Sequence, residues 1–114
     1  MTNILYHNPR CSKSREAKAL LDEKGVDYQT RLYLQEPLSQ DELAQLITRL
    51  KEPLNALVRS KEAEYKAAGL NKDSDQAAII AALVEYPKLL ERPILATKKG
   101  VRIGRPPERI LEIL

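Results

Sequence analysis

The strongest constraint on the fold of this chain is a strand–helix–strand pattern in its first 34 residues. Residues 2–6 include a short apolar run flanked by turn residues, which is typical of a buried strand. Residues 12–24 carry apolar side chains at helical spacing and are followed by Gly25, a common helix stop. Residues 27–34 are extended again, with β-favouring tyrosine and threonine. Because two strands joined through a helix usually pair in parallel, this pattern predicts an α/β fold.

The rest of the chain divides into a helical stretch and a second pair of strands. Residues 39–42, Ser-Gln-Asp-Glu, form a capping box that predicts the start of a helix. Residues 94–103 predict a hairpin that turns at Lys98-Lys99-Gly100, and Pro106 opens a last helix. The order β-α-β, helices, β-β-α predicts a small mixed sheet flanked by helices. At this length we expect one domain, 1–114, with a helical insertion at about 39–86.

The only cysteine and the only histidine lie four residues apart at the first strand-to-helix turn. Amide N–H groups and the helix dipole at such a turn favour an anion, and Arg10, Lys13 and Arg15 add positive charge. Each effect favours the thiolate of Cys11, which is the nucleophilic form. Most free cysteines are small buried hydrophobes, but here no apolar residue occurs within the next four positions. We therefore predict a reactive thiol.

The spacing around Cys11 excludes several kinds of site. Arg15 follows Cys11 after three residues, whereas the C-x5-R motif of a phosphatase loop needs five. A dithiol motif, C-x-x-C, is also excluded, because Ser14 stands in place of its second cysteine. One cysteine and one histidine are too few for a metal site, so we expect no metal. No phosphate-binding Gly-Lys-Ser/Thr loop occurs. What remains is a single thiol nucleophile that must pass its intermediate to an external thiol.

Histidine and arginine side chains are the other candidates for chemistry. His7 could either lower the pKa of the thiol or orient its loop, and the sequence leaves both roles open. Arg59, Arg92 and Arg105 occur in apolar or proline-rich surroundings, and the last two directly precede proline. Surface arginines are usually solvated, but guanidinium groups converging near a thiolate would bind an oxyanion through forked hydrogen bonds. Whether the Arg92–Pro93 bond is cis is not evident from the sequence.

Composition narrows the partners and the compartment. The net charge of +3 is spread among alternating acids and bases, and the five tyrosines are scattered, so we expect no nucleic-acid partner. No long apolar segment predicts a membrane span, and the N-terminus lacks the pattern of a secretory signal. A lone free thiol is typical of a reducing compartment. We expect a cytoplasmic protein that acts as a monomer.

Taken together, these motifs resemble those of the glutaredoxin-dependent arsenate reductase family. The shared elements are Tyr-His-Asn-Pro-x-Cys-x-x-Ser-Arg at residues 6–15, Leu-Tyr-Leu at 32–34, Arg59, Glu-Arg-Pro-Ile at 91–94 and Arg-Pro at 105–106. The resemblance covers essentially the whole chain and looks closest to the short bacterial members. It implies a thioredoxin-like fold with a helical insertion, which fits the order of elements predicted independently.

The resemblance also implies a reaction and a set of site residues. Cys11 would attack arsenate, and the oxyanion and its cysteine–arsenic adduct would be bound by three arginines, Arg59, Arg92 and Arg105. Ser14 and Arg15 would line the anion site at the helix start, and His7 would help to hold the thiolate. Glutathione, as co-substrate, would attack the adduct, and glutaredoxin would resolve the mixed disulfide with release of arsenite. No bound cofactor is implied.

Two other functions fit the same residues. A glutathione-dependent thiol reductase could use Cys11 on a substrate other than arsenate. A regulatory adaptor could share the fold, because the motifs are also similar to those of transcriptional regulators that bind RNA polymerase. Those regulators usually carry a Cys-x-x-Cys switch in this loop, and Ser14 stands in place of its second cysteine, which favours the enzyme.

Overall fold

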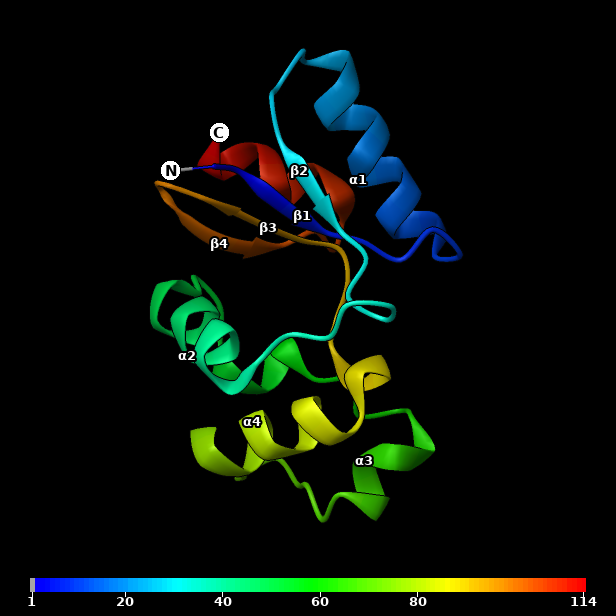
Figure 1. Ribbon diagram of the computed structural model, residues 1–114, viewed down its shortest axis with the longest axis vertical. Coiled ribbons are helices and arrows are strands. Elements are labelled where there is room, and N and C mark those ends of the chain that lie inside the picture. Colours follow the sequence, from blue (N-terminus) through cyan, green and yellow to red (C-terminus); the bar gives the residue numbers. More distant parts are fainter. Residues whose placement is uncertain (1) are drawn as a thin grey trace.

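A four-stranded mixed sheet forms the frame of the molecule in the computed structural model, which describes residues 2–114 (Figure 1). Its strands lie in the order β2-β1-β3-β4. The parallel pair is β1 with β2, whereas β3 runs antiparallel to both β1 and β4. The strand bounds are β1 (Ile4–Tyr6), β2 (Gln29–Arg31), β3 (Ile94–Thr97) and β4 (Gly100–Ile103). The predicted α/β class with a small mixed sheet is therefore confirmed.

Helix α1 (Ser12–Glu23) joins the two parallel strands, as the N-terminal pattern predicts. It ends where Gly25 adopts a φ of 67°, a left-handed conformation that costs glycine little. The second strand is shorter than the extended segment predicted over residues 27–34. Its pairing ends at Arg31 because a turn begins at Leu32, whose carbonyl accepts the N–H groups of Gln35 (3.0 Å) and Glu36 (2.8 Å).

The two faces of the sheet are covered by different helices (Figure 1). Leu5 and Leu95, neighbours on β1 and β3, are fully buried beneath α1 and the C-terminal 3-10 helix η3 (Pro107–Ile113). The other buried members of this cluster come from the two helices: Ala17 and Leu21 of α1, and Ile110 and Ile113 of η3. Each fully buried leucine contributes roughly 1.5–3 kcal/mol to folding. This layer therefore anchors the start of α1, and with it Cys11, to the sheet.

The opposite face packs against the helical segment between β2 and β3. The capping box is confirmed at its start: the Ser39 hydroxyl accepts from the Glu42 N–H at 3.1 Å, and the Glu42 carboxylate accepts from the Ser39 N–H at 3.0 Å. The helices of this segment are α2 (Gln40–Arg49), η1 (Leu54–Leu57), α3 (Ala63–Ala67), α4 (Gln76–Glu85) and η2 (Pro87–Leu89).

Within residues 2–114 no helix is long and apolar enough to cross a membrane.

The segments before β3 and after β4 lie side by side at the open end of the C-terminal hairpin. The hairpin turns at Lys98–Lys99, as predicted, and both the Arg92–Pro93 and the Arg105–Pro106 peptide bonds are cis. Just after β4, the Gly104 N–H donates to the Pro93 carbonyl at 2.8 Å. A Cβ at residue 104 would lie only 2.8 Å from the Pro93 ring, so only glycine allows this approach without displacing its neighbour.

Candidate active site

Cys11 lies at the N-terminus of α1, in the position that caps the helix. Its backbone is extended (φ −96°, ψ 124°), and its carbonyl accepts the Arg15 N–H at 3.0 Å. The first amides of a helix have no partner within the helix, and here those of Lys13 and Ser14 face the thiol and lower its pKa. The half-buried sulfur is thus both reachable from solvent and surrounded by donors.

These donors change the ionisation of the thiol. Burial alone would raise the pKa of Cys11, but the Ser14 backbone N–H and the hydrogen bond and charge of the Arg92 guanidinium outweigh it. The net effect is a pKa below its usual value of 9.0, since each of these groups stabilises the thiolate more than the thiol. The geometry therefore favours the anionic form of the sulfur, which is the form that a nucleophile requires.

The loop around Cys11 is held from inside by His7 and Ser14. The His7 Nδ1 and Ser14 Oγ atoms share a hydrogen bond of 2.6 Å, and the same hydroxyl accepts the Asn8 N–H at 3.0 Å. Both side chains are buried, with His7 5 % and Ser14 0 % exposed. Burial and the charges of Lys18 and Arg15 lower the pKa of His7, so the ring is neutral near pH 7.

Ser14, Arg15 and His7, which were expected to line the anion site or to hold the thiolate, lie in different places around the loop. The Ser14 hydroxyl points inward to the histidine, and it is the Ser14 amide that faces the thiol. Among residues 2–114, the hydrogen-bond partner of the His7 ring is Ser14 rather than Cys11. Arg15 lies on the exposed side, where its Nη1 donates to the Pro9 carbonyl at 3.0 Å. These three residues thus shape the loop that carries the sulfur.

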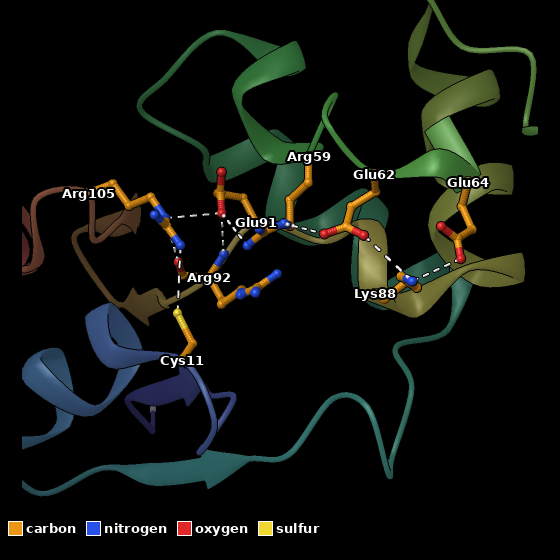
Figure 2. A network of polar contacts seen from close by, with 8 residues as sticks. All are labelled: Cys11, Arg59, Glu62, Glu64, Lys88, Glu91, Arg92 and Arg105. Carbon is orange, nitrogen blue, oxygen red and sulfur yellow. Dashed lines mark hydrogen bonds and ion pairs between the residues drawn. The ribbon is translucent and has the colours of Figure 1, made fainter. Parts of the chain in front are cut away.

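The guanidinium group of Arg105 contacts the sulfur, and Arg92 lies beside Arg105. The Arg105 Nη2 atom lies 3.6 Å from Cys11 Sγ, and Arg105 Nε donates to the Arg92 carbonyl at 2.9 Å (Figure 2). The close packing of Gly104 on Pro93 explains this contact, because it brings the residues before and after the hairpin side by side. The Nε atom of Arg92 is buried and has no hydrogen-bond partner among the described residues.

Arg59 enters the site from the helical segment. Val58 and Leu90 form an isolated antiparallel bridge, with the Arg59 N–H donating to the Leu89 carbonyl at 2.8 Å. This pairing places Arg59 beside Glu91, with Nη1 and Oε1 3.6 Å apart. Two of its guanidinium nitrogens, Nε and Nη1, are buried and make no hydrogen bond within the described part of the chain. Unsatisfied charged donors are uncommon and suit an anionic ligand.

Two residues of the site were missed by the sequence interpretation. Glu91 lies at the centre of the arginine cluster, and its only signal was its place beside Arg92, where a surface ion pair was the simpler explanation. Tyr33 is 1 % exposed, and its hydroxyl has no hydrogen-bond partner among residues 2–114. Burial, chiefly, raises its pKa to about 12, with Asn8, Arg59, Arg92 and Cys11 as its polar neighbours. Its position in a Leu-Tyr-Leu run indicated only a strand.

An open cleft leads to this cluster. Its volume is ≈ 310 Å³, and it is lined by Val58, Arg59, Ser60, Lys61, Glu91 and Arg105. The lining is therefore dominated by cationic groups, with one carboxylate among them. The thiol and the arginine cluster together draw side chains from four separate segments. These are the Cys11 loop, the chain after η1, the residues before β3 and those after β4 (Figure 2). A small anion that entered this cleft would meet guanidinium groups close to the thiol.

Comparison with known proteins agrees with this geometry. The model of the ArsC family matches residues 6–113, nearly the whole chain. The chain belongs to the ArsC family. Among related ArsC sequences, a Haemophilus influenzae protein named "Arsenate reductase" is 44 % identical, with 100 % of both chains covered. The Escherichia coli "Uncharacterized protein YfgD" is 46 % identical, covering 96 % of this chain and 94 % of its own.

A solved structure extends the similarity to the fold. "Arsenate reductase from Vibrio cholerae" superposes with a TM-score of 0.91 at 44 % identity, covering 100 % of this chain and 98 % of the other. The thioredoxin-like fold predicted for this ArsC member is thereby confirmed.

Proposed function

We propose that this protein reduces arsenate to arsenite, with the Cys11 thiolate as the nucleophile. The observation that carries the proposal is a thiol of lowered pKa with a guanidinium nitrogen 3.6 Å away and further buried guanidinium donors that make no hydrogen bond within residues 2–114. Several relatives that share the family are named arsenate reductases, which supports arsenate as the oxyanion.

The first step is an exchange of ligands on arsenic. The Cys11 sulfur attacks As(V), an As–O bond breaks, and the oxygen leaves as water after taking up protons, so that a Cys11–S–As(V) adduct forms. No electrons have moved at this stage. Arg59, Arg92 and Arg105 bind the oxygens of the adduct, and their charge stabilises the negative charge that builds up in the transition state.

The second step moves two electrons. The thiolate of glutathione attacks the Cys11 sulfur, the S–As bond breaks, and its electron pair stays on arsenic, which leaves as arsenite. A disulfide between Cys11 and glutathione remains, and a glutaredoxin thiol attacks the glutathione sulfur to release the Cys11 thiolate. The chain supports the use of external thiols because Cys11 is its only cysteine. Since such a cycle needs a reducing compartment, we place it in the cytoplasm.

The other candidate residues act on the thiol through its loop. The Ser14 amide faces the thiolate and stabilises it, while the hydroxyl of Ser14 and the ring of His7 keep that amide in place. Arg15 closes the loop on its outer side through the Pro9 carbonyl. We therefore propose a positioning role for His7 rather than proton transfer, because the neutral ring is buried away from the cleft.

The direct test is the formation of arsenite by purified protein supplied with arsenate, glutathione and glutaredoxin. We expect turnover that Cys11→Ser abolishes and that Arg105→Ala or Arg92→Ala lowers at least about tenfold, because each removes a charged donor to the reacting group. Arg10→Ala is the matched control, since Arg10 is exposed in the same loop and its backbone N–H bonds Asn8.

Two outcomes would contradict parts of the proposal. Turnover with thioredoxin in place of glutathione and glutaredoxin would keep the reaction but overturn the thiol partners. Absence of arsenite above background with either thiol system would overturn arsenate as the substrate. A glutathione adduct on Cys11 formed with another oxidised substrate would then favour a different thiol reductase.

A further inference from the structure

Glu91 occupies the centre of the arginine cluster. Its Oε1 atom lies 3.1 Å from Arg105 Nε and 3.6 Å from Arg59 Nη1, and the same oxygen accepts the Arg92 backbone N–H at 3.1 Å (Figure 2). The carboxylate is therefore in contact with donors from all three candidate arginines. Glu91 Oε1 thus occupies donors that could otherwise bind an oxygen of a substrate oxyanion.

The contacts of the arginines show that Glu91 is not needed to hold them in place. Arg105 is also anchored by the Arg92 carbonyl at 2.9 Å, and its Nη2 reaches the sulfur. Arg59 is also paired with Glu62, whose oxygen lies 3.4 Å from Arg59 Nε. Glu62 is in turn paired with Lys88 at 3.5 Å, farther from the thiol. Removal of the charge on Glu91 would thus leave the guanidinium groups supported.

A carboxylate in this position has an electrostatic cost for any incoming anion. It repels an oxyanion bound within a few ångströms, and it also neutralises part of the positive charge that would attract that oxyanion. Like charges that share one set of donors compete for them. The cleft is lined by Glu91, Arg59 and Arg105, the last of which also contacts the thiol, so an oxyanion in that cleft meets this competition directly.

We propose that Glu91 is an internal competitor of the oxyanion: its carboxylate occupies guanidinium groups that bind the substrate and thereby sets how tightly the substrate is held. The inference rests on the proposed function only in taking an oxyanion as the substrate. It assigns Glu91 as an affinity-setting residue for tetrahedral oxyanions.

The substitution Glu91→Gln isolates the charge. Glutamine keeps a side-chain oxygen that can accept the Arg92 N–H, but it carries no negative charge and repels no anion. We expect the affinity for an oxyanion to rise about three- to tenfold, as expected for loss of one nearby charge in a partly exposed site. Glu91→Asp keeps the charge and should bind oxyanions within about twofold of the unsubstituted protein, on the same reasoning.

The experiment measures binding without relying on arsenate turnover. Cys11 is alkylated with iodoacetamide in the presence of increasing inorganic phosphate or sulfate, which occupy the anion site but cannot be reduced by a thiol. The concentration that halves the alkylation rate reports anion affinity. Glu112→Gln is the matched control, because that carboxylate pairs with Arg102 at 3.1 Å outside the site, and Glu62→Gln tests the distance dependence.

The outcomes separate this inference from the proposed function. Stronger protection in Glu91→Gln, a smaller gain in Glu62→Gln and no change in Glu112→Gln would support it, together with a lower KM for arsenate in Glu91→Gln. Equal or weaker protection in a folded Glu91→Gln variant would overturn it and show that Glu91 only supports the arginines. Phosphate protection without any arsenite formation would overturn the proposed reaction while leaving the competitor role of Glu91 in place.

Discussion

Replacement of Ser14 with alanine removes one buried oxygen atom that serves two hydrogen-bond partners. The Asn8 N–H, 3.0 Å away, and the His7 Nδ1, 2.6 Å away, would both lose that partner. A buried polar group without a partner costs about 1–3 kcal/mol, and the Asn8 amide is only partly buried, so water can replace part of its loss. We expect a combined cost of about 2–4 kcal/mol, reduced by about 0.5 kcal/mol because alanine favours the helix.

The expected cost is large enough to measure by thermal unfolding. For a chain of this size, 1 kcal/mol shifts the Tm by roughly 4 °C, so Ser14→Ala should lower the Tm by about 6–14 °C. Urea titration at 25 °C gives the free energy of unfolding directly. Ser12→Ala is the matched control, because Ser12 is an exposed serine in the same first turn of α1, and its Tm should change by less than about 2 °C.

The same variant distinguishes support of the loop from an effect on the thiol. The Ser14 backbone N–H remains in Ser14→Ala, and so does Arg92, so the pKa of Cys11 should stay low even though the loop is less stable. A Tm equal to that of Ser12→Ala would refute the reasoning that the buried hydroxyl holds the loop. A normal thiol pKa in a fully folded Ser14→Ala would refute the separate roles of hydroxyl and amide.

Three further predictions follow from other contacts. Arg92→Ala should raise the pKa of Cys11, because a hydrogen bond and a positive charge that stabilise the thiolate are lost; alkylation rates measured against pH, with Arg10→Ala as the control, will check it. The free energy of unfolding should fall as the pH drops through 6.5, because the folded protein resists protonation of His7 and the unfolded chain does not. Urea titrations at several pH values between about 5 and 7 will check it: the free energy of unfolding should depend less steeply on pH in His7→Asn. Tyr33→Phe should leave the free energy of unfolding unchanged or raise it by about 1 kcal/mol, since it deletes a buried hydroxyl without a partner, and a loss above about 1 kcal/mol in urea titration would contradict this.

The elements that depend on local signals were predicted from the sequence. A short apolar run flanked by turn residues and a helical spacing of apolar residues identify the β-α-β unit, and the capping box identifies the start of α2, because each signal lies within a few consecutive residues. The length of β2 was overestimated, since β-favouring residues continue past Arg31 while the pairing does not. A strand ends where its hydrogen bonds end, and propensity alone does not report that position.

The local half of the site could likewise be predicted, because the thiol and the helix amides that stabilise it belong to ten consecutive residues. The other half depends on tertiary contacts that no short-range pattern reports. The Val58–Leu90 bridge places Arg59 beside Glu91, and the Gly104–Pro93 contact places Arg105 beside Arg92.

The same tertiary contacts place a negative charge, the carboxylate of Glu91, at the centre of the site. In sequence, Glu91 next to an arginine suggests a solvated ion pair that contributes little. In the structure its carboxylate lies between two guanidinium groups, one of which touches the thiol, so its charge acts on whatever anion the thiol meets. A count of arginines alone would therefore overestimate the attraction of this cleft for an oxyanion, because one of the positive charges is already balanced from within the chain.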